Sequence, residues 1–283
     1  MPMMGLSKSA HWFSIVISGE NMMDEDLVLS PDTPTVDRIE FYFVNGDEVV
    51  RTSVTGDTIP LSQLDYPYRI PVIPFEITAQ GRCTKIILRA TSSVGVEIPL
   101  TLTTASLLAE SQQSVLVFDG ALLMIFLFCF GISVVLFAYT RDTLFLGVTF
   151  FFRGTTIFLL SQTGLGRIWF WPGSIDANTR ISLVSATALI ASLCLIGRSL
   201  HFENRYRSSA NIVLRFLIYG MISLGLDYII IPFHQMNSDN VVPIMVIALL
   251  VAITVLIMAS ITAAQDSKAA IYLVTYWSLI ILA

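Results

Sequence analysis

The sequence predicts a mixed protein of two domains: an N-terminal antiparallel β-sandwich over residues 1–114, and an all-α bundle of transmembrane helices over residues 115–283. Two observations predict this division. The stretch of residues 118–140 carries no charge after Asp119, and about 20 such residues cross the hydrocarbon core of a bilayer as a helix. Before this run, short segments of alternating apolar and polar residues are separated by turn residues, which is typical of antiparallel strands.

Composition supports a membrane protein with an acidic soluble part. Of the 283 residues, 54% are hydrophobic and only 13% are charged, which is typical of an integral membrane protein. Residues 1–117 hold 7 Lys and Arg against 14 Asp and Glu, whereas residues 118–283 hold 9 against 7. The acidic first part argues against nucleic acid as a partner and against docking on an anionic lipid surface.

Short strands with regular turn signals are expected throughout the first domain. The strand-like segments are residues 12–18, 27–30, 38–44, 47–54, 75–78, 85–91 and 97–103. Within residues 38–44, for example, Ile39, Phe41 and Phe43 share one face of a strand. Six or seven such strands indicate a β-sandwich of the jelly-roll kind.

Local signals refine this β-sandwich. Asn45-Gly46 lies between two strand patterns and predicts a hairpin with a type I′ turn, which needs positive φ at both residues. Residues 60–74 contain four prolines, which exclude a central strand and predict an ordered loop or an edge strand. Residues 104–114 are expected to form a short polar linker to the membrane helices.

Five complete membrane spans and a partial sixth are expected in the second domain. They cover about residues 118–139, 144–163, 180–200, 212–231, 241–263 and 269–283. The external loop 164–179 contains Trp169, Phe170 and Trp171, which fits an aromatic belt at the membrane interface.

The charges of the connections predict the orientation. If the first domain lies outside the cytoplasm, the cytoplasmic loops carry most of the Lys and Arg residues, as the positive-inside rule requires. These residues are Arg141, Arg198, Arg205, Arg207 and Lys268. We therefore expect a multi-pass protein of the inner membrane whose N-terminal domain is periplasmic or extracellular.

Several polar residues fall within the expected spans. Arg153 is about nine residues into the second span and Asp227 is about fifteen residues into the fourth, so an ion pair between them is one hypothesis. The alternative is that each finds water or backbone carbonyls separately. Asp119 is expected to favour the N-terminus of the first span. Small residues in the third span indicate close helix packing, with a homodimer contact as the weaker alternative: Ser185, Ala188 and Ser192.

Five side chains of the first domain are candidates for binding a ligand: Trp12, Tyr42, Tyr66, Tyr68 and Arg69. Exposed aromatic rings beside a charge suit a sugar or a small organic acid. The alternative for each ring is a place in the core of the sandwich, which is the more common use of an aromatic side chain in such a fold.

The sequence carries no sign of catalysis, of a metal site or of a cofactor. His11, His201 and His234 have no partner at metal-ligand spacing, and the three cysteines form no metal or disulfide pattern. No nucleophile elbow, phosphate-binding loop or zinc-protease motif is present. We therefore expect a protein that is not an enzyme.

The order of these parts resembles a known family, the bacterial seven-transmembrane receptors with diverse intracellular signalling modules. In the first domain the matching stretches are WFSIVISGEN, LVLSPDTPTVDRIEFYF, TGDTIP and PVIPFEI. In the second they are FDGALLMIFLF, YTRDTLFLG and GLGRIWFWP. The resemblance covers roughly residues 12–283. It implies an extracellular jelly-roll domain, a seven-helix membrane domain, and a ligand of the carbohydrate class.

Relative to that family, the chain is expected to be truncated at both ends, because an export signal, the seventh helix and the output module are not found in it. The predicted function is that of a sensory receptor fragment. Its first domain would bind a small-molecule or carbohydrate ligand, and its helices would pass the signal to a cytoplasmic output module. The alternatives are a membrane scaffold that binds an envelope protein and a small-solute transporter.

Overall fold

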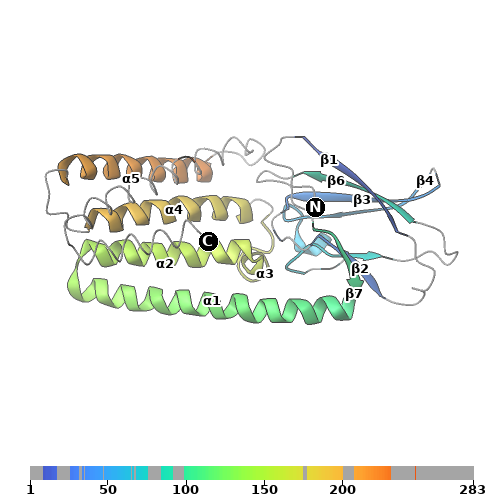
Figure 1. Ribbon diagram of the computed structural model, residues 1–283, viewed down its shortest axis with the longest axis horizontal. Helices are drawn as coiled ribbons and strands as arrows, with labels where there is room; N and C mark the ends of the chain where they lie inside the picture. The colour runs from blue at the N-terminus through green and yellow to red at the C-terminus, as the bar shows by residue number, and fades with distance from the viewer. Residues whose placement is uncertain are drawn as a thin grey trace, which may run out of the picture. The chain divides into compact units, whose positions relative to one another are not determined.

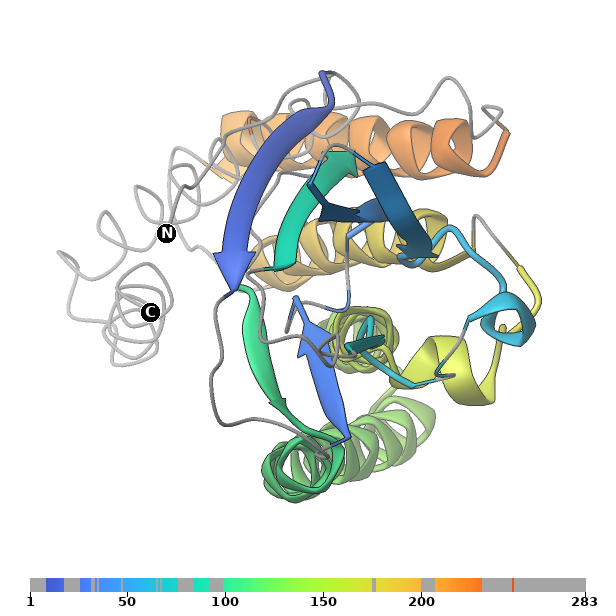
Figure 2. The same ribbon diagram turned by 90° about the vertical axis from the view of Figure 1, so that its right-hand side faces the viewer.

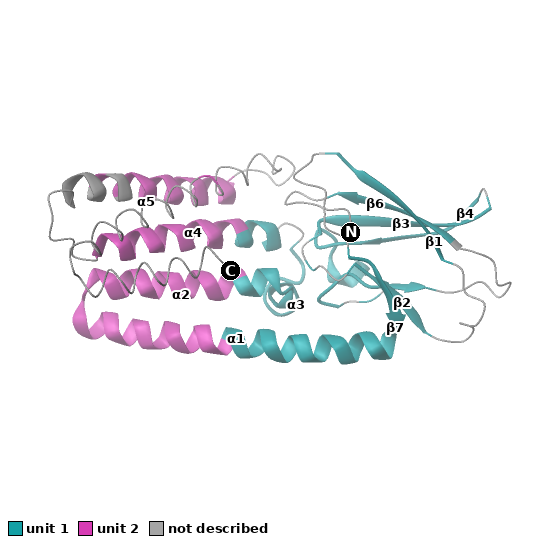
Figure 3. Cartoon of the chain, in the orientation of Figure 1, with its two compact units in different colours: residues 1–123, 159–182, 232–238 teal, residues 124–158, 183–231, 239–283 magenta. Residues whose placement is uncertain are grey.

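The computed structural model describes residues 9–17, 26–31, 34, 36–46, 48–64, 66, 68–75, 84–91, 99–174, 177–199, 207–230 and 246. The chain divides into two compact units (Figure 3). Unit 1 comprises residues 1–123, 159–182 and 232–238, and unit 2 comprises residues 124–158, 183–231 and 239–283. The spans expected at residues 241–263 and 269–283 lie outside the described residues, apart from residue 246.

Two antiparallel sheets form the β-domain, the name we give to residues 9–104 of unit 1 (Figure 1). The first sheet has the order β1 (His11–Ile17), β6 (Thr84–Thr91), β3 (Arg38–Asn45) and β4 (Glu48–Thr55). The second has the order β5 (Ile73–Phe75), β2 (Leu27–Ser30) and β7 (Thr101–Thr104). The predicted layout, antiparallel β-sheets followed by a helical region, is confirmed.

An apolar core joins the two sheets. Ile39, Phe41 and Phe43 of β3 are buried, as their period of two predicts, and they belong to one cluster with Leu29 of β2. The rings of Phe43 and Phe75 lie 6.1 Å apart and connect the first sheet to the second. Burial of each such side chain contributes about 1.5–3 kcal/mol, so this cluster is what holds the sandwich together.

The β3–β4 hairpin forms where the sequence predicts it, but its turn lies one residue later. Asn45 remains in β3 and pairs with Glu48, while Gly46 has a φ of +66°. Asn45 does not have the positive φ of a type I′ turn, so that prediction is wrong. A bulge accompanies this difference: Val50 is left out of the ladder, between the pairs Phe43–Arg51 and Val44–Val49.

The second sheet has β5 at one edge and β2 at its centre. Pro74 lies in β5 at the edge of this sheet, which confirms the edge strand predicted from the prolines. All four residues of β2 are buried. Leu29 faces the core between the sheets, whereas Val28 faces a second cluster with Ile70 and with Leu108 of the first helix.

The described helices are α1 (Ala105–Thr140), α2 (Thr143–Gln162), α3 (Leu165–Trp169), α4 (Ala177–Ser199) and α5 (Arg207–Ile230). Three of them, α1, α2 and α4, are long and apolar enough to cross a membrane by length and composition. Helix α1 contains the first expected span, and α2, α4 and α5 contain nearly all of the second, third and fourth.

Helix α1 begins much earlier than the sequence predicts. Residues 104–114 are not a linker, because β7 leads directly into α1 at Ala105. The hydroxyl of Thr104 accepts a hydrogen bond from the Leu107 amide, as an N-cap does, and the Ala105 amide donates to Asp26 O at 2.9 Å. The 36 residues of α1 reach about 54 Å, more than the ~30 Å hydrocarbon core requires.

The helical segments of unit 2 lie side by side in the order α1, α2, α4, α5 (Figure 2). Glycines allow the close approaches between neighbours: Gly147 and Gly154 of α2 face Ile196 and Leu189 of α4. Of the small residues predicted to mediate packing in α4, Ser185 and Ser192 are buried and Ala188 is exposed.

Candidate functional site

Two of the five predicted ligand residues come together on the outer face of the first sheet. The rings of Trp12 and Tyr42 lie 6.0 Å apart and are stacked, although β6 separates their strands. Arg89 of β6 fills the space between those strands, with its guanidinium 6.0 Å from the Trp12 ring. Trp12 is 59% exposed, so its ring is accessible to a ligand.

The carboxylate of Glu40 is the common hydrogen-bond acceptor for the polar side chains around these rings. This carboxylate accepts hydrogen bonds from Tyr42 Oη at 2.7 Å, from Arg38 Nε at 3.0 Å and from Arg89 Nη1 at 3.1 Å. The bond from Tyr42, with the charges of Arg89 and Arg38, lowers the pKa of Glu40, and burial opposes this. The same bond raises the pKa of Tyr42. We call Trp12, Arg38, Glu40, Tyr42 and Arg89 the sheet-face cluster.

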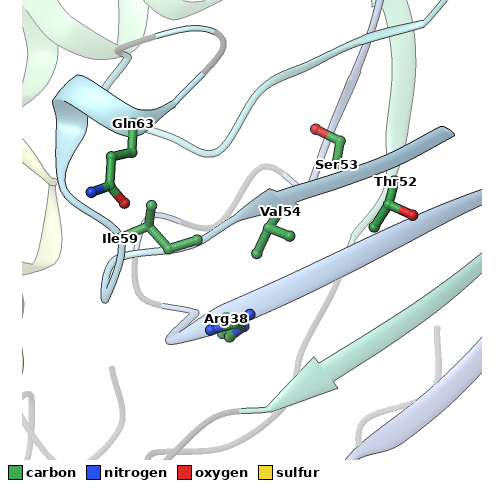
Figure 4. A pocket seen from close by; sticks show the side chains of 6 residues that line it. All are labelled: Arg38, Thr52, Ser53, Val54, Ile59 and Gln63. Carbon is green, nitrogen blue, oxygen red and sulfur yellow. The ribbon is translucent and has the colours of Figure 1, made fainter.

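An open pocket of about 300 Å³ adjoins the sheet-face cluster at Arg38 (Figure 4). Its lining comes from β3, from β4 and from the segment that follows β4: Arg38, Thr52, Ser53, Val54, Ile59 and Gln63. The pocket therefore offers one cationic group, several polar groups and a small apolar wall. This combination suits a small polar ligand with an anionic or hydroxylated end.

Arg69, by contrast, does not face solvent. It is 7% exposed and forms an ion pair with Asp119 of α1, with 2.8 Å between Nη1 and Oδ2. Its Nε and Nη2 both donate to Gln112 Oε1, at 3.0 and 2.6 Å, and Nη1 also donates to Thr163 O at 3.4 Å. Arg69 thus connects the loop before β5 to α1 and to the residue after α2.

The position of Asp119 differs from the sequence prediction. Asp119 was expected at the N-terminus of the first span, but α1 begins at Ala105, so Asp119 lies well inside the helix. Its charge is balanced by Arg69 and not by the helix terminus. No local pattern could reveal this pair, because 50 residues separate its members.

A second buried contact involves Asp57, in the turn after β4. Asp57 is 4% exposed, and its Oδ2 accepts a hydrogen bond from Asn178 Nδ2 of α4 at 3.4 Å. Asn178 Oδ1 lies 3.0 Å from Ser161 Oγ of α2 and accepts from Trp171 Nε1 at 3.3 Å. Arg167 of α3 donates to Ile59 O, close to the same turn.

The charge of Asp57 is poorly compensated. Burial and the nearby charge of Asp37 raise the pKa of Asp57 to about 7, against the smaller effects of Asn178 and Arg167. Asp57 Oδ1 has no hydrogen-bond partner among the described residues. Burial also lowers the pKa of Arg167, which is 4% exposed.

Two glycines allow the backbone to approach closely here. Gly164, at the start of α3, has a φ of +74°, and a Cβ at this position would lie 2.5 Å from Arg69 O. Gly56, beside Asp57, has a φ of +141°, and its Cβ would lie 2.3 Å from Asp37 O. Both positions therefore require glycine.

These contacts define one site within unit 1, which we call the junction. It consists of Asp57, Ile59 and Arg69 of the β-domain with Gln112, Asp119, Ser161, Thr163, Gly164, Arg167, Trp171 and Asn178 of the helical segments. The sequence contains only indirect signs of this site, since the expected external loop 164–179 includes Arg167 and Trp171. Trp169 and Phe170 are exposed there, whereas Trp171 turns toward Asn178.

The remaining predicted residues make none of these hydrogen bonds of the junction. Tyr66 is 42% exposed, and Tyr68 packs against the cluster of Val28 and Leu108. In unit 2, Arg153 of α2 and Asp227 of α5 are both exposed, and no ion pair joins them in the part of the chain that the structure describes.

Sequence models of two domain families match the chain. Residues 1–104 match the model described as 7TMR-DISM extracellular 2. Residues 116–283, more than half of the chain, match the model described as 7TM diverse intracellular signalling. A search of curated proteins finds no match.

Proposed function

The chain belongs to the 7TM diverse intracellular signalling family, and from this premise we propose that it senses a ligand on its β-domain and relays binding through the junction to its helices. Membership makes it a multi-pass membrane sensory receptor with an extracellular domain. The ligand, the route of the signal and the periplasmic placement of the domain in an inner membrane are parts of the proposal. So is the absence of an enzymatic activity in this chain.

The observation that carries the proposal is the buried polar bonding of the junction. Arg69 bonds to groups of α1 and to Thr163, and Asp57 bonds to α4. Charged and polar groups that are buried together must remain paired, because an unpaired one costs several kcal/mol. A ligand that displaces the loop of Arg69 or the turn of Asp57 would therefore favour a different set of bonds to the helices. Such coupling requires two states that the ligand binds unequally.

The sheet-face cluster and its adjoining pocket are the ligand site that we propose. The exposed ring of Trp12 offers a flat surface for a sugar ring, and Arg38 and Arg89 are donors for a carboxylate or for hydroxyl groups. The pocket is continuous with the turn of Asp57 through Ile59, whose carbonyl accepts from Arg167. The candidate ligands are therefore carbohydrates and small organic acids.

A thermal-shift screen of the purified full chain in detergent tests this function. Sugars and small organic acids are the probes, and a ligand that binds only the folded state raises the melting temperature by mass action. We expect a saturable rise with at least one class. Trp12→Ala should weaken binding about tenfold, since loss of a well-packed aromatic contact costs 1 kcal/mol or more.

Val16→Ala is the matched control, because Val16 is exposed on the same face of β1. It should leave the affinity unchanged. Equal losses in both variants would mean that the ligand does not bind at the sheet-face cluster. A broad panel with no shift at all would contradict the small-ligand receptor and favour a scaffold that binds an envelope protein.

A further inference from the structure

We propose that Asp57 is a proton-binding site within the junction, so that external acidity sets how the β-domain holds the helical segments. The inference rests on the proposed receptor function and adds a second input to it. The ligand here is the proton itself, and the responding element is the turn between β4 and the short helix η1 (Leu61–Gln63).

The geometry holds the carboxyl group away from water. The Asp57 amide donates to Val36 O at 2.9 Å, and the amide and hydroxyl of Thr58 donate to Asp37 O at 3.1 and 2.6 Å. Gly56 packs against the backbone of Asp37. The backbone of the turn is thus fixed on both sides of Asp57, and the Asp57 side chain is buried.

The surroundings of Asp57 suit the neutral acid better than the carboxylate. Asn178 donates one bond to Oδ2, while Oδ1 has no donor among the described residues. An ionised carboxylate accepts several hydrogen bonds, so a buried one with a single donor is destabilised. The charged groups that act on Asp57 are Asp37, from the segment before β3, and Arg167, from α3. Asn178, from α4, is uncharged.

Loss of the proton from Asp57 changes the electrostatic interactions within the junction. A negative Asp57 repels Asp37 and attracts the guanidinium of Arg167, which in the present structure donates to Ile59 O. Arg167 then either shifts toward Asp57, or the turn opens until water reaches Oδ1. In both cases the bonds between the turn and α3 and α4 are rearranged. The raised pKa of Asp57, about 7, places this change near neutral pH.

Infrared titration of the full chain in lipid nanodiscs measures the proton directly. We expect a carbonyl band of a protonated carboxylic acid that disappears between about pH 5 and pH 9 with a midpoint near 7. Asp57→Asn should lack this band. Glu48→Gln, which changes an exposed carboxylate at the start of β4, should keep it.

The proposal predicts opposite shifts of the titration midpoint in two further variants. Asp37→Asn removes a negative charge and should lower it, whereas Arg167→Gln removes a positive charge and should raise it. The fluorescence of Trp171 reports the junction, because its Nε1 donates to Asn178. The pH-dependent part of the emission should follow the same midpoint and should vanish in Trp171→Phe.

A titrating band that survives in Asp57→Asn, or wild-type protein without a titrating band, would overturn the proposal. If Asp57→Asn does not fold, the midpoints of Asp37→Asn and Arg167→Gln still test the proposal. Opposite shifts of the two midpoints support a proton site at Asp57, and shifts of equal sign contradict it. No ligand is used in this titration. Failure of the ligand screen and failure of the proton site are therefore separate results.

Discussion

At the scale of single residues, the junction depends on side chains whose partners are far away in the sequence. Arg69 and Asp119 illustrate this, since one precedes β5 and the other lies inside α1. Their side chains are 8% and 16% exposed, so neither charge can be left to water if the other is removed. Substitution of one partner is therefore more harmful than substitution of both.

Arg69→Gln should lower the free energy of unfolding by about 3 kcal/mol, because it leaves the largely buried carboxylate of Asp119 unpaired. The double variant Arg69→Met, Asp119→Leu should recover much of this loss. Denaturant unfolding of the full chain gives both values. Arg38→Gln is the control: its pair with Glu40 is half exposed and contributes about 1 kcal/mol or less. Equal effects of Arg69→Gln and Arg38→Gln would contradict the buried pair.

Gly164→Ala should be destabilising by at least 1–2 kcal/mol, since its φ of +74° disfavours a Cβ and the added atom would meet Arg69 O. The matched control is Gly173→Ala, where nothing lies within 4 Å of the added Cβ. Thermal melting of the two variants compares them directly. A melting temperature that falls equally in both would mean that the close approach at Gly164 has no energetic importance.

At the scale of elements, the direct connection from β7 into α1 fixes the rotation of the helix relative to the sheet. Leu108, Gln112 and Asp119 all lie on the face of α1 that meets the β-domain. Their spacing of four and seven residues keeps them on one side of the helix. No flexible segment separates this face from the strand that precedes it.

Insertion of one Ala after Thr104 should therefore disrupt the junction. One extra residue turns the rest of α1 by about 100° and moves it by about 1.5 Å, so that Gln112 and Asp119 no longer reach Arg69. The same insertion after Gly173, in an exposed segment, should be tolerated. Limited proteolysis of the full chain distinguishes the two insertions. Equal resistance to the protease would show that the junction does not depend on the rotation of α1 about its axis.

At the scale of the whole molecule, the features that could be predicted from the sequence are those that depend on residues close together along the chain. Alternation found the strands, as at Ile39, Phe41 and Phe43, and apolar length found α1, α2 and α4. The start of α1 was missed because its first turns are polar, although they contain no residue that breaks a helix. The stacking of Trp12 on Tyr42 and the pairing of Arg69 with Asp119 depend on strand order and on tertiary packing, which no local pattern records.

The stability of the whole molecule should depend on pH through Asp57. Its pKa is raised in the folded state from 3.8 to about 7, so the folded chain binds more protons than the unfolded chain between these values. The free energy of unfolding therefore decreases as pH rises from about 4 to about 7, by up to about 4 kcal/mol, and this contribution then stays constant. Unfolding of wild-type and Asp57→Asn chains across this range measures the difference. An identical pH dependence in both would contradict it.

The burial of β2 on both faces has an evolutionary consequence. A strand with one wet face can change every second residue at little cost, but each residue of Leu27–Ser30 touches packed atoms. Divergence among relatives should therefore be slowest in this strand. Where Val28 does change in volume, we expect compensating changes at Ile70 or Leu108, which fill the same space. In an alignment of relatives, residues of β2 should therefore covary with residues of α1 that pack against them.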